Sequence, residues 1–84
     1  MLNSFEFAGH RYEVSLGDIP SMEYARYQLE QNTGQLWKWC SRGTQYVLYP
    51  VNCWTETQSG NLIGRDDTIE IINPIVFPVL MNCF

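Results

Sequence analysis

Residue types that carry catalysis and metal binding are scarce in this chain. It contains one histidine and three cysteines, and no two cysteines form the CxxC pair by which zinc modules are recognised. A nucleophile also needs a base and an orienting group beside it, and the sequence indicates no such arrangement. We therefore expect a protein that is not an enzyme and holds no cofactor. The alternative of a small metal- or thiol-dependent protein would use Cys40, Cys53, Cys83 and His10.

Positive charge is scarce as well. Five lysines and arginines oppose nine aspartates and glutamates, which gives a net charge of −4. A nucleic-acid-binding protein normally presents a basic face, so we expect no direct contact with nucleic acid. An acidic protein associates faster with a basic surface, because opposite fields steer the encounter. The charge therefore favours a larger partner protein with a basic surface.

Hydrophobic runs are too short to cross a membrane. The longest nearly apolar stretch, residues 74–84, is well below the ~20 residues that a spanning helix needs, and it contains Pro74 and Pro78. The first ten residues do not follow the pattern of a secretory signal peptide. An odd number of cysteines is typical of free thiols in a reducing compartment. We expect no membrane contact and a cytoplasmic location, which is the host cytoplasm if the protein is encoded by a phage.

The residues that are present predict a single α+β domain over residues 1–84. Alternating apolar and polar side chains on either side of Gly9 predict a β-hairpin over residues 5–16. Residues 20–33 predict a helix. Ser21 is the expected N-cap, or Pro20 a first-turn proline, and Gly34 is expected to end the helix.

The helix has two predicted faces. Spacings of three and four place Met22, Ala25 and Leu29 on a core stripe, and we expect the stripe to be widened on one side by Tyr24 and Tyr27. Spacings of the same kind predict a solvated face with local ion pairs, made of Glu23, Arg26 and Glu30.

Strands are predicted for most of the remaining chain. The pattern favours strands over residues 36–40 and 44–49, a bent or edge strand over 51–57, a loop over 58–67, a short strand over 68–72 and an extended segment over 75–81. A helix on one face of a mainly antiparallel sheet is the natural arrangement for this order of elements. Hairpin, helix and three to four further strands follow each other as in a β-grasp, a name that describes the architecture alone.

Aromatic side chains are the most informative group. Trp37 and Trp39 lie two residues apart, so they face the same side of a strand. They fit a core beneath the helix, or a binding face, because Trp and Tyr are enriched at interface hot spots. One helix covers only part of a sheet, and we therefore expect a partner-binding patch with carboxylates at its rim. Its residues are Trp37, Trp39, Tyr46, Trp54, Asp66 and Asp67.

The end of the chain, residues 71–84, carries no charged side chain. It fits a final strand inside the sheet, or an apolar contact with a second copy or another protein. Pro74 and Pro78 disfavour a central strand along the whole segment. We therefore expect part of it at an edge, with Ile75, Phe77 and Val79, or their alternates Val76 and Leu80, as an oligomer contact in a homodimer.

These observations favour a small acidic protein-binding module, an inhibitor or adaptor that docks on a larger protein, such as one that handles nucleic acid. Compact acidic proteins without catalytic residues are frequent among phage-encoded inhibitors of bacterial immunity, including anti-CRISPR proteins. That analogy rests on size, charge and missing chemistry alone. The second hypothesis is a self-assembling structural or accessory protein that oligomerises through its apolar C-terminus.

Overall fold

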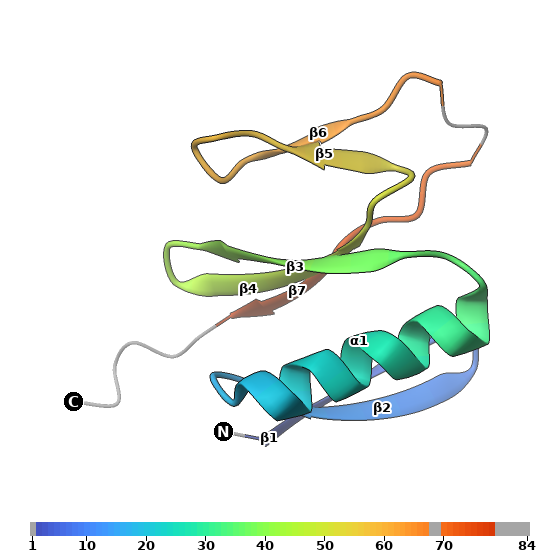
Figure 1. Cartoon of the computed structure of the whole chain (residues 1–84), viewed down its shortest axis with the longest axis vertical. Helices are drawn as coiled ribbons and strands as arrows, with labels where there is room; N and C mark the ends of the chain where they lie inside the picture. Colours follow the sequence, from blue (N-terminus) through green and yellow to red (C-terminus); the bar gives the residue numbers. More distant parts are fainter. Residues whose placement is uncertain (1, 68–69, 79–84) are drawn as a thin grey trace.

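The computed structural model of the chain describes residues 2–67 and 70–78, and it shows one helix with several antiparallel strands (Figure 1). The strands form three small sheets: a hairpin β1–β2, a three-stranded sheet in the order β3-β4-β7, and a hairpin β5–β6. The α+β class is confirmed. The β-grasp-like order is not confirmed, because the N-terminal hairpin forms a sheet of its own and does not pair with the later strands.

The N-terminal hairpin forms as predicted and starts a few residues earlier. Strand β1 (Leu2–Phe7) pairs antiparallel with β2 (His10–Ser15), with Phe7 opposite His10. The two turn residues, Ala8 and Gly9, both have positive φ, at 52° and 83°. A two-residue turn of this kind matches the right-handed twist of the flanking strands.

Helix α1 spans Ile19–Thr33 and begins one residue before its predicted start. Its N-cap is Asp18, whose side chain accepts a hydrogen bond from the Ser21 N–H at 3.4 Å. Of the two predicted helix starts, Pro20 in the first turn is confirmed and Ser21 as the N-cap is wrong. The Ser21 hydroxyl instead accepts the Ser15 N–H at 2.8 Å and ties the helix to β2. Gly34 ends the helix in the left-handed region, at φ 71°.

The core stripe of the helix is narrower than predicted. Met22, Ala25 and Leu29 are buried, as expected, whereas Tyr24 and Tyr27 are 61% and 54% exposed. The tyrosines lie about 130° and 170° around the helix from the centre of the buried stripe, at 100° per residue. Their large apolar rings suggested burial, and their angular position overrides that suggestion.

The three-stranded sheet lies beside the helix and shares its core. Strands β3 (Trp37–Arg42), β4 (Gln45–Pro50) and β7 (Ile75–Pro78) pair antiparallel, with β4 in the centre. One core cluster joins the hairpin, the helix and the sheet through these buried side chains: Tyr12, Val14, Met22, Ala25, Leu29, Trp37, Leu48 and Phe77. Strand β7 lies at an edge of the sheet, as Pro78 indicated.

The other face of the sheet is covered by a second hairpin. Strand β5 (Trp54–Glu56) pairs with β6 (Leu62–Gly64), and their side chains pack on Cys40, Val47 and Tyr49. The prediction of a loop over 58–67 was therefore wrong at residues 62–64, which form β6. A strand this short next to glycines gives too weak a pattern to be recognised in the sequence. The predicted strand over 68–72 does not form at residues 70–72, and residues 68–69 lie outside the described part of the chain.

No helix in the described residues is both long and apolar enough to cross a membrane.

Candidate functional site

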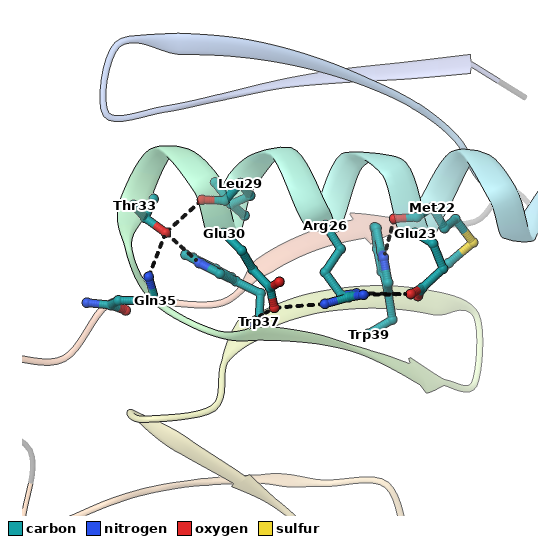
Figure 2. A network of polar contacts seen from close by, with 9 residues as sticks. All are labelled: Met22, Glu23, Arg26, Leu29, Glu30, Thr33, Gln35, Trp37 and Trp39. Carbon is teal, nitrogen blue, oxygen red and sulfur yellow. Dashed lines mark hydrogen bonds and ion pairs between the residues drawn. The ribbon is translucent and has the colours of Figure 1, made fainter.

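The two tryptophans of β3 lie beneath the helix and are fixed by their indole N–H groups (Figure 2). Trp37 is 2% exposed and donates its Nε1–H to the Thr33 hydroxyl at 3.0 Å. Trp39 is half-buried and donates its Nε1–H to the Met22 carbonyl at 2.8 Å. A buried indole N–H usually requires such a partner. The core interpretation therefore describes Trp37, and Trp39 lies at the border between core and surface.

An ion-pair row runs along the helix beside these tryptophans (Figure 2). Arg26 contacts Glu23 and Glu30, each with an N–O distance of 2.8 Å, which confirms the predicted local ion pairs. The hydrogen bond to Glu23, followed by the charges of both carboxylates, raises the pKa of Arg26 in spite of partial burial. Glu30 also accepts the backbone N–H of Trp37 at 2.9 Å, so the row connects the helix to β3.

A groove of about 480 Å³ lies between this row and β3. Its apolar lining comes from Leu36, Trp37, Trp39 and Val51, and its polar lining from the ion-pair row and Lys38. Leu36 is 62% exposed, which is high for a leucine on a groove wall. The groove therefore offers apolar surface that the fold itself does not bury.

One side of the β3 backbone is not paired with another strand of the described residues. Among residues 2–67 and 70–78, β3 pairs with β4 alone, so its other side is a free sheet edge. The Val51 N–H donates to the Leu36 carbonyl at 3.0 Å, which makes this pair hydrogen-bonded across the strands. Antiparallel pairs alternate, so the backbone polar groups of Trp37, Trp39 and Ser41 point to the free edge. Of these groups, the Trp37 N–H is bonded to the Glu30 carboxylate.

The opposite face of β3 carries two exposed cations, Lys38 and Arg42, on either side of the buried Cys40. Arg42 donates to the Asn61 side-chain oxygen at 3.2 Å, and no described carboxylate lies within ion-pair distance of either cation. Burial, followed by the hydrogen bond and charge of Glu56, raises the pKa of the Cys40 thiol, although both cations lower it. Cys40 is thus held as a neutral thiol, which is a poor nucleophile.

The other residues of the predicted patch are not gathered at this groove. Tyr46 packs edge-to-face on Trp39, with ring centroids 6.4 Å apart, on the helix side of the sheet. Trp54 packs on the opposite face and donates its Nε1–H to the Ile72 carbonyl at 2.8 Å. Asp66 and Asp67 are exposed after β6, where Asp67 pairs with Arg65 at 3.6 Å. The four aromatic residues are therefore divided between two faces of one sheet.

The residues predicted as an oligomer contact are also divided. Phe77 is 5% exposed and packs in the main core, with Ile75 beside it. Val76 faces the other way and is 48% exposed. Val79 and Leu80 lie outside the described residues.

The residues considered for metal or thiol chemistry do not meet within the described part. Cys40 and Cys53 are buried free thiols, His10 is exposed at the hairpin turn, and Cys83 lies outside the described residues. In residues 2–67 and 70–78, no three His, Cys, Asp or Glu side chains are close enough to hold a metal ion.

A second exposed surface was missed by the sequence reasoning. Tyr24 and Tyr27 lie beside Gln28 and Arg11, at two surface hollows of about 370 and 380 Å³ that are lined by both the helix and β2. The signal that could have found it is the helical angle of the two tyrosines, which sets them away from the core stripe.

The pKa of Tyr49 leads to a test of the packing on this side of the sheet. Burial, and then the nearby Glu56, raises the pKa of Tyr49 above its ordinary value of 10.0. The folded state therefore keeps the phenol proton at a pH where the unfolded chain loses it. This contribution to stability is fully present below the ordinary pKa and is lost as the pH rises through the folded one.

We expect wild-type protein to lose stability above pH ~9.5, and Tyr49→Phe to lose less over the same interval, in urea unfolding followed by fluorescence. Tyr24→Phe, which changes an exposed tyrosine, is the matched control and should follow wild type. Equal pH dependence in Tyr49→Phe and wild type would contradict the assigned environment.

No family model matches the chain, and searches of curated proteins and of solved structures find nothing significantly similar to it.

Proposed function

We propose that this protein is a small non-enzymatic protein-binding module, an inhibitor or adaptor, that docks on a larger protein through the groove beside β3. The observation that carries the proposal is the exposed apolar wall of the groove at Leu36, next to Trp39 and Arg26. Trp and Arg are enriched among residues that dominate binding energy, and such residues act best in a pocket that a partner can dry.

The polar groups of the groove support binding rather than chemistry. Arg26 and Glu30 are engaged with each other, and Glu30 also holds the Trp37 N–H. Groups held in this way shape and position the groove. Covering its exposed apolar surface, in contrast, favours binding by about 25 cal/mol per Å² of apolar area buried, before the costs of association are subtracted.

The local charge changes one part of the sequence-based expectation. A partner with a basic surface was inferred from the net charge alone, which acts on long-range encounter. At the groove, Lys38 is the cation that has no carboxylate within ion-pair distance among the described residues, and Arg42 lies four residues further along β3. The charge at the point of docking therefore favours an acidic contact.

The test compares capture of a partner from source cells by three tagged proteins. Leu36→Glu places a charge on the groove wall, and Ile63→Glu makes the same change at an aliphatic residue that is 56% exposed on β6. We expect wild type and Ile63→Glu to capture the same protein, identified by mass spectrometry, and Leu36→Glu to lose at least ~90% of it. Circular dichroism checks that all three are folded. Equal capture by all three proteins would remove the groove as the docking site.

A further inference from the structure

The free edge of β3 offers backbone hydrogen-bonding groups that have no partner among the described residues. The alternation set by the Leu36–Val51 bond directs the N–H and C=O of Trp39 outward, together with the N–H of Ser41. Gly60 lies close to the Ser41 carbonyl oxygen, so the accessible part of the edge centres on Trp39. An edge of this kind can pair with an additional strand unless the protein covers it.

Within the described residues, the helix bonds one backbone group of this edge. The Glu30 carboxylate accepts the Trp37 N–H at 2.9 Å, and Arg26 holds that carboxylate in place. For the backbone N–H of Trp39, two residues further along, the helix supplies no equivalent acceptor among the described residues. Strand β7, at the other edge of the sheet, contains Pro78, which has no backbone N–H to donate to an added strand. A new strand would therefore add more readily at β3 than at β7.

The charges along β3 select what can add. Lys38 and Arg42 lie four residues apart, so they project from the same face at a separation of about 13 Å. Their charges have no carboxylate within ion-pair distance in the described residues, although the chain as a whole has a net charge of −4. The edge strand is thus a locally basic element in an acidic protein.

We propose that β3 accepts an extended acidic segment of a partner protein as an additional antiparallel strand. This rests on the protein-binding function proposed above and names the mode of binding. Backbone hydrogen bonds at Trp39 and Ser41 would supply affinity, and side chains at alternate positions would supply specificity.

The register predicts which residues the segment carries. Residues directly opposite each other share a face of the sheet. The residue opposite Trp39 would therefore face the apolar groove, and the residues opposite Lys38 and Arg42 would lie on the cationic face. The segment that fits all three positions carries, in this order, an acidic residue, two residues of any type, an apolar residue and a second acidic residue.

A second copy of this chain fits the edge less well. Antiparallel pairing of β3 with its own copy, centred on Trp39, would place the two Lys38 side chains in diagonal positions about 7–8 Å apart. Pairing centred on Ser41 would do the same for Arg42. Like charges at these positions oppose self-pairing, whereas carboxylates of a partner are attracted there.

The test uses the full chain and the peptide acetyl-TETVLEVT-amide, which places glutamates opposite Arg42 and Lys38 and leucine opposite Trp39. Binding is measured by fluorescence anisotropy of the labelled peptide, and amide exchange is measured by NMR. We expect the peptide to bind at least ~10-fold more tightly than a counterpart that has lysines in place of the glutamates. Its binding should weaken when salt is added. We also expect the Trp39 amide to exchange more slowly in the complex, while the Lys38 amide, already bonded to β4, stays unchanged.

Two variants that change the net charge by the same amount distinguish the effect of the two cations on β3 from the effect of the overall charge of the protein. The double variant Lys38→Glu/Arg42→Glu should lower the affinity for the peptide at least ~10-fold, because two attractions become repulsions at exposed positions. The control, Arg11→Glu with Lys38 and Arg42 intact, changes an exposed cation on β2 and should bind as wild type does. A further Arg65→Glu change in the control makes the charge change equal.

Several results would overturn strand addition at β3. They are the absence of binding at about millimolar peptide, binding that the double variant leaves unchanged, and a Trp39 amide that gains no protection. Self-association of the protein in light scattering, with the same Trp39 amide protected in the dimer, would assign the edge to a second copy instead. If the peptide fails while Leu36→Glu still abolishes capture of a cellular protein, the binding function stands and the strand mode falls. If capture is also insensitive to Leu36→Glu, both fall.

Discussion

Replacing Leu29 by alanine is expected to lower the free energy of unfolding by about 3 kcal/mol. Leu29 is completely buried where the helix meets the hairpin and the sheet. The change removes buried apolar surface and leaves a cavity that close-packed neighbours fill only in part. A domain of this size has a stability of about 5 kcal/mol or a little more, so the variant should be close to unfolding at 37 °C.

Tyr24→Ala is the matched control for that change, because it also truncates a large side chain on the same helix. Tyr24 is 61% exposed, and its hydroxyl accepts a hydrogen bond from Gln28, which is also on the surface. We expect a change within about 0.5 kcal/mol, as for other exposed positions. Urea unfolding of both variants measures the difference. A loss of stability in Tyr24→Ala comparable with that in Leu29→Ala would contradict the orientation of the helix.

The second large effect is expected at Glu30. Glu30→Ala removes an ion pair and also leaves the Trp37 backbone N–H without its acceptor beside a side chain that is 2% exposed. A half-buried donor that loses its partner costs about 1–3 kcal/mol. We expect Glu30→Ala to lower stability by about 2 kcal/mol in urea unfolding, and to increase the exchange rate of the Trp37 amide.

Glu23→Ala provides the comparison, since Glu23 pairs with the same arginine at the same distance but is 53% exposed and holds no backbone group. An exposed ion pair contributes about 0–1 kcal/mol, so this variant should be nearly as stable as wild type. Glu30→Gln keeps an acceptor for the Trp37 N–H and should fall between the two. Equal losses in Glu30→Ala and Glu23→Ala would show that the carboxylate contributes charge and no backbone bond.

Local signals were enough to predict the elements that form from neighbouring residues. The hairpin around Gly9 followed from alternation and a positive φ, and the helix ended at Gly34 for the same conformational reason. The core stripe of Met22, Ala25 and Leu29 followed from helical periodicity. These predictions succeeded because each depends on backbone geometry within a few residues.

The candidate site could be predicted only in part. Alternation correctly placed Trp37 and Trp39 on one side of a strand, but it could not indicate that the helix covers Trp37 and leaves the groove at Trp39. Trp54 was grouped with them by residue type, and the chain reversal through β5 put it on the opposite face. Strand β6 was missed because a strand of three residues, the last of them Gly64, carries too little periodicity to be recognised.

Sequence alone established the α+β class, the helix with its buried stripe, the N-terminal hairpin and the local ion pairs of Arg26. All of these arise from contacts between residues close in the chain. Which strand has a free edge, which tryptophan is covered and where two cations remain without a carboxylate partner were decided by packing in three dimensions. The physical reason is that an edge, a groove and an unpaired charge are defined by what lies beside them in space, and for β3 those neighbours are Glu30 on the helix and Asn61 after β5.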